Sequence, residues 1–153
     1  MRFDVLVAPA LADKEFAVVT LRPDDGSDDA RLSIDYTPIR RRCRGPNILA
    51  LDFLLIASCV YAVDKLVSRT NSADCWTRQL TLSIPVSDPH AWTSVSQRLA
   101  EAVSFLTGDF WSFEFTSLTK GLARPKRGRV KRFPSLRGEA VSLFSGGLDS
   151  LVG

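Results

Sequence analysis

The chain of 153 residues contains one histidine, one methionine and three cysteines. His90 has no other histidine, cysteine or carboxylate at metal-ligand or triad spacing. We therefore expect a surface side chain at a helix start, and no histidine-based nucleophilic triad. Cys43, Cys59 and Cys75 are odd in number, lie far apart and include no CxxC pair. Neither a disulfide framework nor a zinc site is expected within this stretch.

The start of the chain also lacks an apolar segment behind basic residues, so no signal peptide is expected. The longest apolar run, Ile48–Val63, holds 16 residues and contains Asp52. A bilayer requires roughly 20 residues and disfavours an internal carboxylate. We interpret the run as a helix of the protein core, and we expect a cytoplasmic protein without membrane contact.

Hydrophobic residues make up 45% of the chain and charged residues 24%, which excludes a disordered or fibrous class. The net charge of +3 is unevenly distributed. Eight Lys or Arg residues and no acid lie between Lys120 and Arg137, and four arginines lie in the segment 40–44. Such segments are most often solvated linkers, but they also bind nucleic acid, nucleotide phosphates or acidic partners.

Alternation of apolar and polar residues predicts five strands. They cover approximately residues 3–8, 16–21, 31–36, 80–86 and 111–116. The polar residues 22–29 predict a turn between the second and third strands. Pro85 indicates the end of the fourth strand or an edge position.

Two helices are predicted between these strands. The first runs from Ile48 to about Ser68 with Asn47 as its N-cap, and its apolar character nearly all round indicates a central helix. Asp52 within it is most simply explained by a pair with a nearby arginine. The second begins at Ser87-Asp88-Pro89 and ends before Gly108. Its apolar residues recur at helical spacing: Trp92, Val95, Leu99, Ala102, Val103 and Leu106.

These elements predict an N-terminal α+β domain over residues 1–119, with about five largely antiparallel strands and two main helices. Residues 120–138 read as a basic linker or arm, because they hold glycine, proline and charge but little else. Residues 139–153 have a different pattern and are expected to begin a second domain.

A short apolar run, residues 140–144, precedes the sequence Ser145-Gly146-Gly147-Leu148-Asp149-Ser150. This order predicts a buried strand that enters a glycine-rich turn and then a helix. The amides of such a turn converge on one point at the positive end of the helix, which favours an anion. The serine hydroxyls can donate to phosphate oxygens, and Asp149 can cap the helix or help to hold magnesium. A plain Gly-Gly turn is the structural alternative.

The motif lacks the GK[ST] ending of a Walker A loop and the GxGxxG of dinucleotide-binding folds. The pattern SGGxDS instead resembles the PP-loop ATP pyrophosphatases, and residues 143–150 are most similar to the loop of the 7-cyano-7-deazaguanine synthases, the QueC family. Members cleave ATP between the α and β phosphates and adenylate an acyl or carbonyl oxygen, after which a nucleophile displaces AMP. The resemblance implies ATP and Mg²⁺ as cofactors and implies that residues 145–150 bind the nucleotide: Ser145, Gly146, Gly147, Leu148, Asp149 and Ser150.

About 138 residues precede the loop, a layout similar to that of the QatC-like proteins of Qat anti-phage systems. Segments 57–66 and 76–86 resemble the N-terminal domain of those proteins. This resemblance implies a deazapurine-type carboxylate as substrate. It also implies that ammonia or an amine on a partner protein of a defence operon is the acceptor.

By the same resemblance, residues 139–153 are the start of an α/β PP-loop domain of the adenine nucleotide alpha hydrolase type. The remaining strands and the zinc-binding cysteines of that family would follow Gly153, so we expect the chain to be an N-terminal fragment that is inactive alone. Two alternatives stay open. One is a partner- or nucleic-acid-binding module with a non-functional loop. The other is a different PP-loop ligase, of the amidotransferase or tRNA-modifying type.

Overall fold

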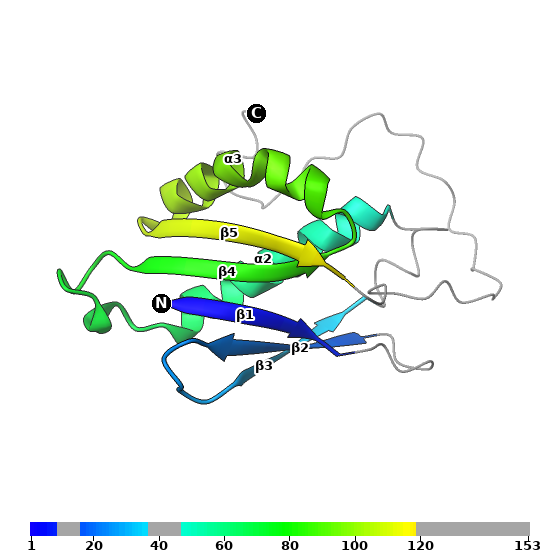
Figure 1. Ribbon diagram of the computed structural model, residues 1–153. Helices are drawn as coiled ribbons and strands as arrows, with labels where there is room; N and C mark the ends of the chain where they lie inside the picture. The colour runs from blue at the N-terminus through cyan, green and yellow to red at the C-terminus, as the bar shows by residue number, and fades with distance from the viewer. Residues whose placement is uncertain (9–15, 37–46, 119–153) are drawn as a thin grey trace, which may run out of the picture.

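The chain forms a five-stranded sheet with two long helices (Figure 1). The computed structural model describes residues 1–8, 16–36 and 47–118. The elements are β1 (Arg2–Val7), β2 (Phe16–Pro23), β3 (Ala30–Asp35), α2 (Ile48–Leu66), the 3-10 turn η1 (Arg69–Asn71), β4 (Gln79–Val86), α3 (Pro89–Thr107) and β5 (Phe110–Ser117). The α+β class, the five strands and the two main helices are thus confirmed.

The strand order is β3-β2-β1-β4-β5, and the sheet is mixed. β2 pairs antiparallel with β1 and with β3, whereas β4 pairs parallel with β1 and with β5. The prediction of a largely antiparallel sheet is therefore wrong. Helices connect β3 to β4 and β4 to β5, and such crossovers return the chain in the same direction, which gives parallel strands.

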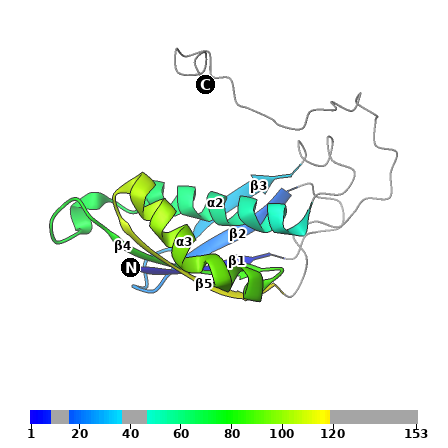
Figure 2. The same cartoon turned by 90° about the horizontal axis from the view of Figure 1, so that it is seen from above.

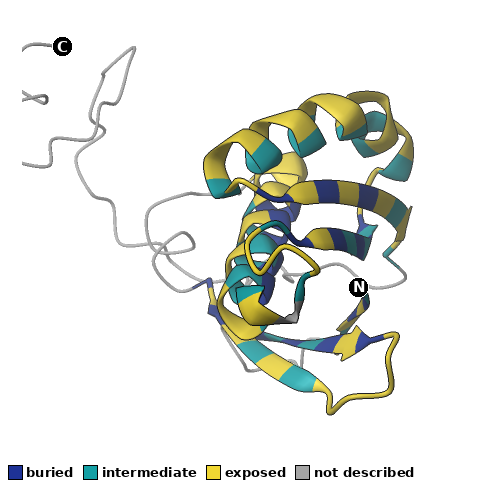
Figure 3. Ribbon diagram, turned by 90° about the vertical axis from the view of Figure 1, so that its left-hand side faces the viewer, coloured by how far each residue is buried: buried dark blue, intermediate teal, exposed yellow. Residues whose placement is uncertain are grey.

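Alternate residues of the strands face α2 and form the core. In β4, for example, Leu80, Leu82 and Ile84 are buried whereas Thr81 and Ser83 are only partly covered. Fully or nearly fully buried apolar residues come from every strand and from α2: Phe3, Val5, Ala17, Val19, Leu21, Ile34, Tyr36, Leu51, Leu55, Ile56, Cys59, Val63, Leu80, Leu82, Ile84, Val86, Trp111 and Phe113. The opposite face of the sheet is mostly polar and half-buried or exposed, and both long helices lie on the other face, so the domain has two layers (Figures 2 and 3).

Helix α2 crosses the sheet behind β4 and β1 (Figure 1). Asn47 caps it by accepting the N–H of Leu49 at 2.9 Å, as predicted. Its buried side chains form one stripe, while Phe53 and Tyr61 are 55% and 65% exposed on the outer side. The helix contributes one side to the core, as expected of a central helix, but its outer side is exposed because only one layer packs against it.

Helix α3 lies beside β5 and begins and ends as predicted. Asp88 accepts the N–H of Ala91 at 3.0 Å, and Gly108 ends the helix with a φ of +74°. Trp92, Leu99 and Val103 pack against the core. Ser104 Oγ of α3 accepts the backbone N–H of Trp111 at 3.1 Å, so the helix also shields the β5 edge of the sheet. Within the predicted apolar face, Leu106 is 79% exposed.

A buried guanidinium joins the segments at the amino end of β4. Arg78 is 3% exposed, and each of its five N–H donors has an acceptor. Two are the carboxylate oxygens of Asp109, one is the carboxylate of Asp64, and two are the carbonyls of Asp64 and Val67. The backbone N–H of Arg78 also donates to Asp109 at 2.9 Å.

Arg69 completes this network from η1. Its guanidinium donates to both oxygens of Asp109, at 3.0 and 3.1 Å, and to the carbonyls of Trp76 and Thr107. Burial alone would raise the pKa of Asp109, but hydrogen bonds from the side chain and backbone of Arg78 outweigh it and lower the pKa. The Asp109 carboxylate in turn raises the pKa of Arg78.

We predict that Asp109→Asn lowers the free energy of unfolding by about 3–5 kcal/mol, because it leaves a buried guanidinium without its main counter-charge. The free energy of unfolding of the variant should also depend less on pH. An unfolded aspartate titrates near 3.9, so between this value and the lower folded pKa the unfolded chain binds more protons. Stability of the native chain therefore falls as the pH falls through this window, and the variant should fall less steeply.

Urea unfolding followed by circular dichroism between pH 2 and 7 measures both effects. Arg22→Gln is the control, because it breaks the exposed Arg22–Asp29 pair and should leave the midpoint nearly unchanged. Equal midpoints for the two variants would contradict the role assigned to the buried network.

Candidate functional site

The nucleotide-binding residues predicted from the sequence, Ser145–Ser150, lie outside the described residues. The same holds for Cys43, for the arginines of segment 40–44, for the predicted linker 120–138 and for residues 139–153. The described part of the chain shows where the segment that carries the predicted loop begins. It also shows which polar groups lie there.

Four strands end at the same edge of the sheet. β1, β4 and β5 are parallel, and β3 shares their direction because both β1 and β3 are antiparallel to β2. We call this the carboxyl edge; it is the right-hand side of Figure 1. Both helices begin there, and the segment that leads to residues 145–150 follows the end of β5 at Ser117.

A fully buried carboxylate lies at the carboxyl edge. Asp52 of α2 accepts the backbone N–H of Ser87 at 3.0 and 3.1 Å, its hydroxyl at 3.0 Å, and the indole N–H of Trp92 at 3.1 Å. Ser87 lies in the turn between β4 and α3, and Trp92 lies near the start of α3. Asp52 thus holds the start of α3 against α2, and with no solvent exposure it is suited to positioning and not to proton transfer with a ligand.

The donors to Asp52 among the described residues are neutral. The nearby arginines of segment 40–44, with one of which a pair is expected, lie outside the described residues. Several N–H and O–H donors that point at a buried carboxylate stabilise its charged form. The Trp92 ring adds packing to this contact, since it stacks on Phe53 at 6.4 Å between centroids and meets Phe115 at 6.0 Å. Trp92 therefore joins α2, α3 and β5.

Two buried weak acids, Tyr36 and Cys59, also lie in the core. The pKa of Tyr36 is raised to about 12, mainly by burial and in smaller part by the nearby Cys59 and Asp52. Burial likewise raises the pKa of the Cys59 thiol to about 12. Within the described residues the Tyr36 hydroxyl has no hydrogen-bond partner. Both groups are neutral at physiological pH, and a buried thiol of this kind is not a nucleophile.

A pocket of about 630 Å³ opens at the opposite, amino edge. Asp24, Asp25 and Asp74 lie around it together with Phe110 and the wall formed by Val67. The carboxylates each accept local N–H donors, and those of Trp76 and Thr77 lower the pKa of Asp74 to about 2. The aspartates therefore shape the loops of this edge.

The structure also describes His90 and two of the three cysteines. His90 is exposed in the first turn of α3, as predicted. Cys59 is buried and Cys75 is exposed, and both are free thiols. Among the described residues no three metal-ligating side chains come together. Neither α2 nor α3 is long and apolar enough to cross a bilayer.

No protein-family model matches the chain, and no curated protein or solved structure is similar to it at a significant level. A functional interpretation therefore depends on the residues themselves. In the described part, Asp52 joins α2 to the start of α3 at the carboxyl edge, and the predicted phosphate loop follows β5 in sequence.

Sequence reasoning did not find the Arg78–Asp109–Arg69 network. One signal was present, because Arg78 stands in phase with the buried residues of β4, where a charged side chain requires a partner. Asp109 follows the helix-ending Gly108 and precedes β5, a position from which a partner can reach the start of β4.

We predict that Asp52→Asn destabilises the domain by about 1–3 kcal/mol, because one carboxylate oxygen that accepts hydrogen bonds becomes an NH₂ group facing N–H donors. Thermal unfolding followed by tryptophan fluorescence measures the change. Asp88→Asn is the matched control from the same turn, since asparagine caps helices nearly as well as aspartate. An Asp52→Asn midpoint equal to that of the control would contradict this contact.

Proposed function

We propose that the chain is the N-terminal part of a QueC-like, ATP-dependent adenylating ligase that acts on a deazapurine-type carboxylate in anti-phage defence. Residues 145–150 bind the pyrophosphate portion of ATP, and residues 1–118 form an accessory domain that precedes the catalytic one. The observation that carries the proposal is the sequence Ser145–Ser150 directly after the apolar run 140–144.

The chemistry of these residues supports the proposal. Two glycines permit close approach of the backbone to a phosphate. Two serine hydroxyls and the loop amides supply neutral hydrogen-bond donors. Asp149 provides an oxygen ligand of the kind that Mg²⁺ prefers. In the described domain, the buried side chains of Arg78 and Asp109 contact each other within the fold.

The proposed reaction has two steps. A carboxylate oxygen of the substrate attacks the α-phosphorus of ATP, an O–P bond forms, and pyrophosphate leaves with the electron pair of the bond between α and β phosphates. Ammonia or an amine then attacks the acyl carbon and releases AMP. The loop contributes by binding the leaving pyrophosphate, whose developing charge its donors stabilise. Mg²⁺ neutralises part of the same charge.

We predict that Ser145→Ala and Asp149→Asn, each placed in the full-length ligase, lower pyrophosphate release by about 10²–10³-fold, the usual effect of removing one donor to a developing charge. The assay measures pyrophosphate from ATP in the presence of a carboxylated deazapurine. Ser135→Ala, which lies in the basic segment ten residues before the loop, is the control and should retain activity. Full activity in both loop variants would refute the assignment of the loop.

The basic segment favours a second candidate, binding of nucleic acid by residues 120–137. The segment contains eight cationic residues and no acid, and such residues attract phosphates independently of the nucleotide sequence. This function does not depend on the loop, and it would hold even for a ligase of a different type.

We predict that the affinity of the chain for a single-stranded RNA oligonucleotide falls about 300-fold between 50 and 200 mM salt, if six phosphates are contacted. Fluorescence anisotropy measures the affinity. Replacing Lys126, Arg127 and Arg129 together by glutamine should reduce the salt slope by about 2–3, whereas Arg98→Gln on α3 should leave it unchanged. RNA affinity that does not respond to salt would contradict phosphate binding by this segment.

A further inference from the structure

The strand β3 forms one border of the sheet. It pairs with β2 from Ala30 to Asp35, and no other described strand pairs with it. Alternate residues of an edge strand turn their backbone N–H and C=O groups outward, where another strand can pair with them. Figure 1 shows β3 as the outermost strand on the side away from α3. The β5 border, by contrast, is shielded by Ser104.

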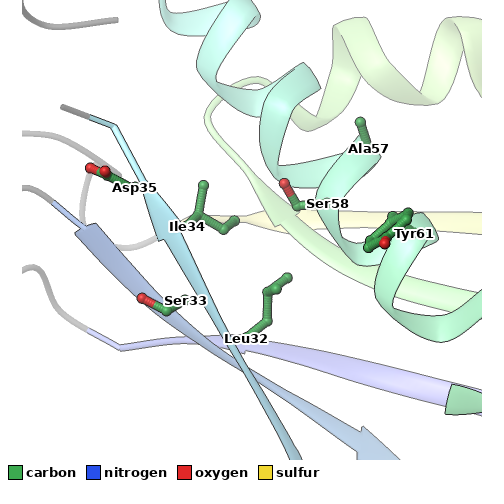
Figure 4. A pocket seen from close by; sticks show the side chains of 7 residues that line it. All are labelled: Leu32, Ser33, Ile34, Asp35, Ala57, Ser58 and Tyr61. Atoms are coloured by element: carbon green, nitrogen blue, oxygen red, sulfur yellow. The ribbon is translucent and has the colours of Figure 1, made fainter. Parts of the chain in front are cut away.

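A groove runs beside this edge. A cavity of about 380 Å³ lies between β3 and α2, with Leu32 and Ile34 on one wall and Ala57, Ser58 and Tyr61 on the other (Figure 4). Leu32 is only half-buried and Tyr61 is 65% exposed. A strand added at the usual spacing of about 4.8 Å would extend the sheet alongside this groove and cover these apolar side chains.

The charge pattern of β3 is complementary to itself. On its outward face the strand carries Arg31, Ser33 and Asp35 in succession. If a second β3 lies antiparallel across the edge with Ser33 at the two-fold axis, Arg31 stands opposite the partner's Asp35, and the reciprocal pair forms as well. Leu32 stands opposite the partner's Ile34 on the groove side. Directly opposite residues share a face, so both kinds of pair contribute favourably.

The neighbouring registers are less favourable. With Leu32 at the axis, Asp29 would stand opposite the partner's Asp35, which places like charges together. With Ile34 at the axis, Arg31 would lose its acid, because Asp35 would stand opposite the partner's Ser33. Asp35 has about four acceptor positions, so a contact with the partner's Arg31 adds to the contacts it makes within its own chain.

We propose that the β3 edge is a homodimer interface, in which a second copy of this chain pairs antiparallel through β3 with Ser33 at the two-fold axis. The two sheets then join into one continuous sheet of ten strands, with the helices of both copies on the same face. The contact uses neither the predicted phosphate loop nor the basic segment.

The experiment is a charge exchange followed by light scattering with size-exclusion chromatography. The native chain should elute as a dimer of 16.9-kDa protomers. Arg31→Asp and Asp35→Arg each place like charges together twice and should weaken dimerisation about tenfold or more. The double variant R31D/D35R restores opposite charges at both contacts and should restore the dimer. Arg98→Asp, which changes the same charge on α3, should remain dimeric.

Disulfide trapping tests the register without altering the charges. Ser33→Cys, in a chain whose Cys43 and Cys75 are replaced by serine, places two thiols at the axis, where opposite Cα atoms lie about 4.5–5.5 Å apart. That separation suits a disulfide, so mild oxidation should give a covalent dimer. Ser112→Cys on β5 in the same background should not. A monomeric native chain, a double variant without rescue or equal cross-linking at both positions would overturn the proposal.

Discussion

The buried guanidinium of Arg78 is the contact on which the arrangement of the domain depends. Its charge is removed from water, so each of its N–H groups requires an acceptor, and a partly satisfied network would cost more than an apolar core. The acceptors come from the end of α2, the segment after it and the start of β5. These segments therefore become ordered together with β4.

The same residue sets the register of the parallel strands. The backbone N–H of Arg78 donates to Asp109, and its carbonyl accepts the N–H of Phe110 at 2.9 Å. Gln79 consequently stands opposite Phe110, and the ladder continues to Val86 and Ser117. A mixed sheet needs such a constraint, because β4 and β5 are joined by a whole helix and not by a tight turn that would fix their pairing.

Local sequence patterns predicted the helices and strands well, but they did not predict contacts between residues far apart in the sequence. The period-2 pattern identified all five strands, and Asn47, Asp88 and Gly108 marked helix ends, since each of these features acts over a few residues. The parallel pairing of β1 with β4 joins residues 79 positions apart, which no local pattern encodes. The apolar outer side of α2 was misleading for a related reason, because hydrophobic composition does not say how many layers will cover a helix.

For the candidate site, the sequence contains the residues with the relevant chemistry, and the structure describes the domain that precedes them. The pattern at Ser145–Ser150 is a contiguous motif, so it is visible without a fold. The contact of Asp52 with Ser87 and Trp92 joins residues 35 and 40 positions apart, and a carboxylate in an apolar helix gave no hint that these two residues donate to it. This contact holds α2 and α3 together at the carboxyl edge, where β5 also ends.

The two borders of the sheet differ in a way that bears on how the domain associates. At β5, Ser104 of α3 occupies the backbone N–H of Trp111 near the start of the strand. At β3 the described residues present an open strand next to an apolar groove, with a base and an acid two positions on either side of Ser33. Natural edge strands usually carry charges that repel a second copy, whereas this spacing attracts one, because a two-fold axis converts the sequence Arg-x-x-x-Asp into two reciprocal ion pairs. Self-association through β3 would leave the carboxyl edge, where the chain continues toward the predicted loop, accessible in both copies.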